Sequence, residues 1–269
     1  MHTIINCLKL VVFKGFIISL PTGNNLQIYY ICFHSILMKK LVHQILGRIR
    51  DRLAYLFLRN LKPGVYMLSY PIHHVSLQPT CSSTYLDDVN QYGSAIADRW
   101  SRDACGIASL KIAIESLKRI DNPAFMLDSI SNLSENANKA GAYIDPIGWK
   151  HKSLIKIAEK FGLHGSNFVE ESHFNICKNI LSDKIVIASV TLYFKGGETV
   201  IRNGKEEKKP KGGHLIILKG FKWEDNKCAG FFYDDCQDQV LLDNDNSNAF
   251  VNISDFLNSY SDKVIYIWN

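Results

Sequence analysis

The first clear periodicity in the chain is helical and covers residues 39–61. Apolar residues recur there every three or four positions, and most lysines and arginines lie off that stripe. Lys62, Pro63 and Gly64 end the pattern. The stripe consists of Val42, Ile45, Leu46, Ile49, Leu53, Leu56 and Phe57. It predicts a basic amphipathic helix, which either packs on its own domain or lies on an anionic membrane surface.

Helical periods continue beyond this segment and then give way to the pattern of strands. Helices are predicted from about Cys105 to Arg119, from about His151 to Phe161 with Gly162 as the stop, and over about residues 172–182. Residues 66–85 look extended. Apolar runs rich in β-branched residues predict strands at Lys184–Leu192, His214–Phe221, Gly230–Tyr233, Gln239–Leu242 and Val264–Trp268. Helices followed by an antiparallel sheet indicate the α+β class.

One long connection interrupts the predicted sheet. Lys195–Gly213 contains five glycines and a run of lysines and glutamates. This composition predicts a solvated, mobile hairpin loop. Because the loop leads directly into His214, we expect it to rim a cleft.

The chain divides into an N-terminal extension, residues 1–63, and a body, residues 64–269. The apolar stretches Leu10–Leu20 and Ile28–Met38 are shorter than the roughly 20 residues that span a bilayer, and neither is followed by a cleavage site. An alternative is that the protein truly starts at Met38, in which case residues 1–37 are upstream translation. We expect a cytoplasmic protein, with peripheral membrane contact through residues 39–61.

Charge and cysteine content exclude several kinds of protein. The net charge is +5, but residues 1–63 hold nine basic residues and one acid, which leaves the body at −3. A nucleic-acid-binding body would need a basic face of its own, so we expect no nucleic-acid partner. The seven cysteines lack the paired spacing of a closed zinc site. We therefore expect no metal and no cofactor.

The first candidate for chemistry is Cys105, at the start of a predicted helix. Ser101 or Asp103 is placed to cap that helix, and the free N–H groups and dipole of a helix N-terminus stabilise a thiolate. Gly106 leaves room for a substrate carbonyl to approach the backbone. Cys105 is either a reactive nucleophile or a buried structural cysteine.

His214 and an aspartate are candidate partners of this thiol. His214 opens an apolar strand directly after Gly212 and Gly213, and Asp234 and Asp235 end the next strand. An aspartate that accepts from one imidazole nitrogen fixes the tautomer in which the other nitrogen takes the thiol proton. The two aspartates point to opposite faces of a strand, so only one can hold His214. A surface histidine and two solvated turn aspartates are the alternative.

The three sequence segments around Cys105, His214 and Asp234-Asp235 together resemble the C39-like peptidases, a family of papain-like cysteine peptidases. The resemblance covers about residues 65–269. Gly148–Leu163 is similar to the family's helix and turn before its sheet, and Ile185–Val190 to the strand that precedes its histidine hairpin. Asp235-Cys236 stands where the family usually has Asp-Pro.

The resemblance implies a papain-like fold and a thiol-dependent peptidase acting on a peptide or protein substrate. Cys105 would attack and form a thioester, His214 would move the proton, and Asp235 would orient the imidazole, with Asp234 in reserve. Two alternatives keep the fold and change the function: a thiol acyltransferase or amidase with the same triad, and a peptide-binding module without activity.

One position departs from the family pattern. These enzymes commonly place a Gln about six residues before the cysteine, where its amide helps to form the oxyanion hole, and this chain has Arg99 there. Gln91 and Gln78 lie further upstream. Loss of one oxyanion donor costs about 10²–10³ in rate, so we expect a slower enzyme if nothing replaces it.

Overall fold

The computed structural model describes residues 25–75, 77, 89–91, 93–145, 147–191, 199–202, 205–208, 211–236 and 249–269. The chain divides into two units, Met1–Arg52 and Leu53–Asn269. The boundary lies inside a helix, α2 (Asn25–Leu58), which begins well before the predicted residue 39. Within the described residues, no helix is both long enough and apolar enough to cross a membrane. The strand predicted at Gln239–Leu242 lies outside these residues.

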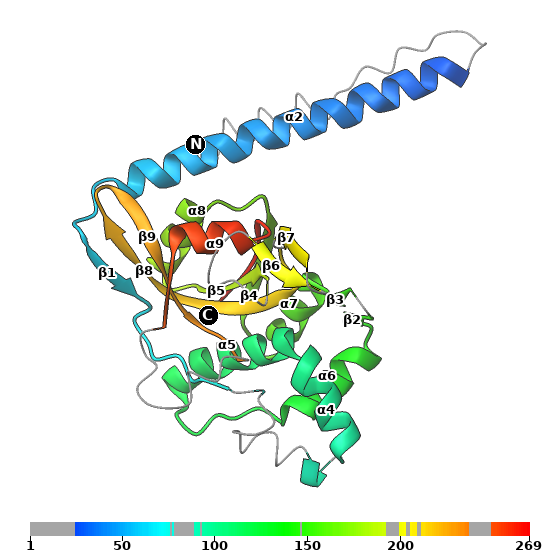
Figure 1. Cartoon of the computed structure of the whole chain (residues 1–269), viewed down its shortest axis with the longest axis vertical. Coiled ribbons are helices and arrows are strands. Elements are labelled where there is room, and N and C mark those ends of the chain that lie inside the picture. Colours follow the sequence, from blue (N-terminus) through cyan, green and yellow to red (C-terminus); the bar gives the residue numbers. More distant parts are fainter. Residues whose placement is uncertain are drawn as a thin grey trace. The chain divides into compact units, whose positions relative to one another are not determined.

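A seven-stranded antiparallel sheet forms the centre of the second unit (Figure 1). Its strands run in the order β10-β9-β8-β5-β11-β4, and β1 pairs with the distal half of β8 beyond the end of β5. Their bounds are β1 Gly64–Met67, β4 His164–Val169, β5 Ile185–Val190, β8 His214–Glu224, β9 Lys227–Asp234, β10 Phe250–Asn252 and β11 Lys263–Trp268. Two short hairpins stand apart from this sheet: β2 (Tyr143–Ile144) with β3 (Gly148–Trp149), and β6 (Thr199–Arg202) with β7 (Lys205–Lys208).

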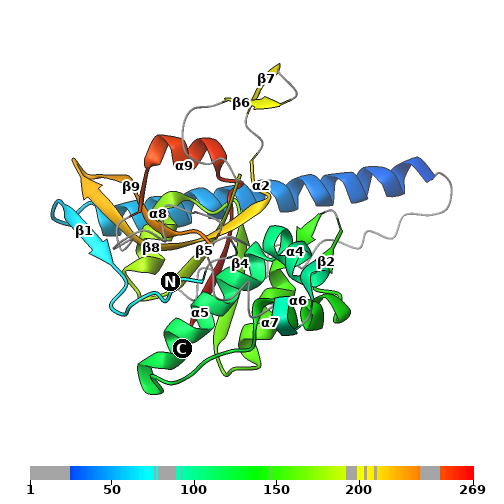
Figure 2. The same ribbon diagram turned by 60° about the horizontal axis from the view of Figure 1, so that its bottom comes forward.

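Helices cover both faces of the sheet (Figures 1 and 2). On one face, α5 (Cys105–Asp121) packs against β8 and β5, and α7 (His151–Glu159) against β4 and β11. On the other face lie α8 (His173–Ile180) and α9 (Ile253–Ser259). Because neither face of the central strands is solvated, every residue of β5 is buried, which explains its continuous apolar run. The α+β class with an antiparallel sheet is confirmed.

Three helices of this unit were not predicted: α4 (Ser94–Asp103), α6 (Ile130–Lys139) and α9. α6 packs against α5, and α4 packs against α6. The buried face of α6 consists of Ile130, Ser131, Ser134 and Ala137. Small polar residues make up half of that face, so it carries no apolar period that the sequence could reveal.

The connection between β5 and β8 contains the β6–β7 hairpin. This confirms the hairpin predicted within Lys195–Gly213. Its two strands are Thr199–Arg202 and Lys205–Lys208. The ends of the connection are held together, because Val190 pairs with His214 across the ladder. Residues 192–198, 203–204 and 209–210 lie outside the described residues, so the mobility of the loop stays a prediction.

The last turns of α2 belong to the second unit and are part of its core. Ala54 and Leu58 are fully buried, and the ring of Tyr55 meets the edge of Phe174 at a centroid distance of 5.3 Å. Leu56 and Phe57, which belong to the predicted apolar stripe, are exposed. In residues 53–58 the packed face is therefore that of Ala54 and Leu58. Membrane contact through residues 39–61 stays a prediction.

Leu58 should contribute more to stability than its equally apolar neighbour. We expect Leu58→Ala to lower the free energy of unfolding by about 2–5 kcal/mol, because it leaves a cavity in the core. Phe57→Ala removes an exposed side chain and should change it by less than about 0.5 kcal/mol. Urea unfolding followed by tryptophan fluorescence measures both. Equal effects would show that this end of α2 is not part of the core.

Candidate active site

Cys105 is the first residue of α5, and α4 ends only two residues before it. Ala104 joins the two helices and caps the second without a side-chain hydrogen bond. The predicted capping by Ser101 or Asp103 is therefore wrong. The hydroxyl of Ser101 instead donates to the Asp98 carbonyl within α4, because residue 101 is still inside that helix. The α5 dipole remains directed at the Cys105 thiol, with no acidic residue in the first turn to offset it.

Trp149 holds the junction of the two helices in place. Its indole N–H donates to the Asp103 carbonyl at 2.6 Å. A Cβ added to Gly106 would lie 2.6 Å from the indole Cγ, so the glycine makes room for this ring. The sequence predicts that Gly106 leaves room for a substrate carbonyl. In the structure the indole of Trp149 occupies the space beside it. The indole of Trp149 also packs against Trp100 and Tyr143.

His214 and Asp235 form a buried hydrogen-bonded pair. The distance between His214 Nε2 and Asp235 Oδ1 is 2.7 Å, and both side chains are almost inaccessible to solvent. The pair exists because β8 and β9 run antiparallel, which brings the start of β8 beside the end of β9. With Nε2 engaged by the carboxylate, Nδ1 is the imidazole nitrogen that remains for another partner.

Cys105 is the second group that influences this imidazole. Burial lowers the pKa of His214, but the hydrogen bonds to Asp235 and Cys105 and the charges of both groups outweigh burial and raise that pKa to about 10. The protonated imidazole is thus the favoured form at neutral pH. The structure brings together all three residues selected from the sequence: Cys105, His214 and Asp235.

Asp234 has a different partner. Its Oδ1 lies 2.7 Å from Nδ1 of His74, a half-buried residue in the segment between β1 and α4. The alternation of side chains along a strand therefore sends the two aspartates to two different histidines. His74 was not selected from the sequence, because it lies in an extended segment without a motif. Its Nε2 is buried and has no hydrogen-bond partner within the described part of the chain.

The other described cysteines differ from Cys105 in their surroundings. Burial, followed by the influence of neighbouring groups, raises the pKa of Cys177 and of Cys236 well above the ordinary value. Cys228 is also buried and hydrogen-bonds to the Gly230 carbonyl. Cys105, by contrast, lines a cleft.

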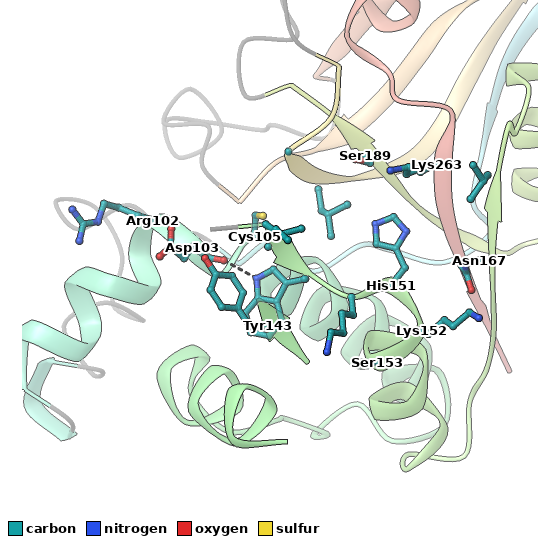
Figure 3. A pocket seen from close by; sticks show the side chains of 17 residues that line it. Arg102, Asp103, Cys105, Tyr143, His151, Lys152, Ser153, Asn167, Ser189 and Lys263 are labelled. Atoms are coloured by element: carbon teal, nitrogen blue, oxygen red, sulfur yellow. Dashed lines mark hydrogen bonds between the residues drawn. The ribbon is translucent and has the colours of Figure 1, made fainter. Parts of the chain in front are cut away.

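The cleft beside Cys105 has a volume of about 660 Å³ (Figure 3). Tyr143 and Trp149 of the β2–β3 hairpin line it on the side of the helices, and Ser189 and Leu215 line it on the side of the sheet. Its size is within the range of small-molecule and peptide-side-chain pockets. Within the described residues, no three His, Cys, Asp or Glu side chains converge as metal ligands would.

Arg99 occupies the position where a glutamine was the family expectation. It lies on α4, and its guanidinium carbon is 4.6 Å from the centre of the Trp100 ring. This cation–π contact holds the side chain along its own helix. Gln91 is exposed, and Gln78 lies outside the described residues.

No family model and no curated protein matches the sequence. The fold is similar to that of several solved structures. A candidate C39-like peptidase from Bacillus anthracis is 12% identical, with a TM-score of 0.45, over 77% of this chain and 98% of that chain. A double glycine motif protease from an AMS/PCAT transporter, solved with a leader peptide, is 12% identical, with a TM-score of 0.38, over 76% and 95%.

The peptidase domain of Streptococcus ComA, a bifunctional ABC transporter of a quorum-sensing pathway, is 11% identical. Its TM-score is 0.37, over 61% of this chain and 90% of that chain. At these values the likenesses do not decide the function, which has to be argued from the site.

Gly106→Ala should test the packing of Trp149 on α5. Alanine normally stabilises a helix relative to glycine by about 1 kcal/mol. Here we expect a loss of about 1–3 kcal/mol, because the added methyl group would overlap the indole. Gly47→Ala in α2 is the control, since a Cβ there meets no atom within 4 Å, and it should not destabilise the protein. Urea unfolding measures both, and a stabilising Gly106→Ala would contradict the contact.

Proposed function

We propose that the protein is a cysteine peptidase, with Cys105 as nucleophile, His214 as general base and acid, and Asp235 as the residue that orients the imidazole. The single observation that carries the proposal is the buried imidazole of His214, which hydrogen-bonds to a carboxylate through one nitrogen and whose pKa is also raised by a neighbouring, cleft-lining thiol. A nucleophile next to a base that is held by a third group is the general arrangement of covalent acyl transfer.

In the proposed resting state the Cys105 proton already lies on His214, as a thiolate–imidazolium pair. The thiolate then attacks the carbonyl carbon of the scissile peptide bond and forms a tetrahedral oxyanion. When that intermediate collapses, the C–N bond breaks and His214 gives its proton to the leaving amine. A thioester remains on Cys105. Water, deprotonated by His214, hydrolyses this thioester, and the acid product leaves as the free thiol is restored.

Helix α5 and the sheet supply different parts of this reaction. The dipole of α5 and the imidazolium of His214 both favour negative charge on sulfur. The Asp235 carboxylate favours the charged imidazole in a place where burial alone would oppose it. In place of the family's glutamine this chain has Arg99, which stacks on Trp100, so we expect turnover to be slow relative to enzymes with a full oxyanion hole.

A transferase or amidase with the same three residues would form the same thioester. An acceptor amine in place of water would give an amide product where the peptidase gives an acid. Mass spectrometry of the products in the presence of added amines separates these two reactions. A binding module without activity would give neither product.

Alkylation of Cys105 by iodoacetamide tests the proposal most directly. The rate of labelling at pH 6.5 should be within about threefold of the rate at pH 9, because His214 stays protonated over that range and favours the thiolate. An ordinary thiol, with a pKa of about 8.5, would differ by roughly a hundredfold between these values. Peptide mapping by mass spectrometry identifies the labelled residue, and Cys105→Ala is the control. A labelling rate that rises steeply toward pH 9 would contradict the proposed ion pair.

Asp235→Asn and Asp234→Asn form a matched pair of variants. We expect Asp235→Asn to slow thioester formation by about 10²-fold or more, because the carboxylate that orients His214 is lost. Asp234→Asn should leave labelling of Cys105 within about twofold, because that carboxylate pairs with His74. The opposite result would exchange the two assignments.

The same pair predicts a pH dependence of stability. The pKa of His214 in the folded protein, about 10, is above its unfolded value of about 6.5. Its contribution is therefore complete below pH 6.5 and is lost as the pH rises through about 10. Asp235→Asn should consequently destabilise the protein more at pH 6 than at pH 10.5 in urea unfolding, with no such difference if the pair is uncharged.

A further inference from the structure

The two ends of the cleft differ in charge. In Figure 3, Asp103 and Tyr143 lie on one side of Cys105, and His151, Asn167 and Lys263 lie on the other. The cysteine stands between them. A substrate bound across Cys105 would therefore meet two different environments, one on each side of the reacting bond.

The Tyr143 end carries both signs of charge. Partial burial and then the nearby carboxylates of Asp103 and Asp145 raise the pKa of Tyr143, whereas the charge of Arg99 lowers it, which locates all three groups at this end. Arg102 also lines the cleft, but its guanidinium points away from Cys105 in Figure 3. Acidic and basic groups therefore offset each other at this end of the cleft.

The Lys263 end is basic. Lys263 opens β11 and is exposed, and Lys152 is exposed on the first turn of α7. Burial first, and then the charge of Lys263, lower the pKa of His151, so the ammonium group lies close to that ring. Among the described residues that line the cleft, Asp103 is the sole carboxylate, and it stands at the other end.

Several donors at the basic end have no partner. Within the described part of the chain, the side chains of Lys263, Lys152, Asn167 and Ser189 take part in no ion pair or hydrogen bond. Ser189 is buried and Asn167 half-buried, and both line the cleft together with Lys263. Donors that line a cleft without a protein partner are available to a ligand with acceptor oxygens.

We propose that this end of the cleft is a carboxylate subsite of the enzyme, in which Lys263, with Asn167 and Ser189, binds an acidic group of the peptide substrate. The proposal rests on the proposed peptidase function. The carboxylate belongs either to a Glu or Asp side chain or to the C-terminus of the peptide. The body of the protein carries a net charge of −3, so a basic end of the cleft is a local feature and not a general property of the surface.

Binding to the full-chain Cys105→Ala variant tests the subsite without turnover. The probes are fluorescein-labelled octapeptide pools with an amidated C-terminus, each with Glu or Gln fixed at one position and a mixture of neutral residues elsewhere. A further pair of pools has no acidic side chain and either a free or an amidated C-terminus. Fluorescence anisotropy gives the affinities.

The expected result is a preference of about tenfold for a carboxylate over its neutral isostere in at least one pair of pools, because a charge-assisted bond replaces a neutral one. The pair that shows it identifies the source as a side chain or a C-terminus. Lys263→Gln in the same background should reduce the preference to within about twofold. Lys227→Gln, at an exposed lysine at the start of β9, should leave it unchanged.

Failure of this proposal and failure of the peptidase are distinguishable. If wild-type Cys105 labels and cleaves peptides while no pool prefers a carboxylate, or the preference survives Lys263→Gln, the subsite is wrong and the peptidase stands. If the preference depends on Lys263 but Cys105 neither labels nor cleaves, the subsite belongs to a peptide-binding protein. If a Glu pool shows the preference, cleavage-site profiling of the wild type should show acidic residues enriched on one side of the cut only, and enrichment on both sides would overturn the proposal.

Discussion

A histidine and an aspartate buried in contact with each other impose the main constraint on this fold. Ionisable groups removed from water are costly unless each has a partner in the correct geometry. His214 and Asp235 satisfy this condition because the first residue of β8 lies beside the end of β9. The ladder that aligns these strands is itself buried between helices on both faces. The sheet therefore has to be complete before the pair is stable.

The thiol comes from the other half of the structure. Cys105 belongs to the junction of α4 and α5, and that junction is fixed by the indole of Trp149 through a hydrogen bond and through contact with Gly106. The β2–β3 hairpin thus positions the helices that carry Cys105, while the sheet positions His214. The cleft lies where these two parts meet, which is why it is lined by residues from both.

The sequence indicated the parts of the molecule in which burial leaves a strong pattern. β5, β8 and α5 are buried along most of their length, so their apolar runs and periods marked them clearly. The histidine and aspartate candidates followed from their positions at the ends of such strands. Alternation along a strand separated Asp234 from Asp235, but only the three-dimensional structure shows which histidine each one meets.

Other features depend on contacts between distant segments and left no local signal. His74 and Asp234 are 160 positions apart in the sequence. The paired strands β1 and β8 are separated in the sequence by all the helices from α4 to α8. The buried face of α6 is small and polar. The cap of α5 was misjudged because α4 was not recognised, and residues inside α4 are not available to cap the next helix.

The β6–β7 connection has a consequence for how this protein can diversify. Its two ends are fixed by the pairing of Val190 with His214, so the intervening chain is closed whatever its length. For a flexible loop in general, doubling the length costs only about 0.6 kcal/mol in closure entropy. Insertions, deletions and wholesale exchange of sequence are therefore cheap at this place, directly before the histidine. Descendants of one ancestral protein, or a library made in the laboratory, can vary there while the pairing of His214 with Asp235 is kept.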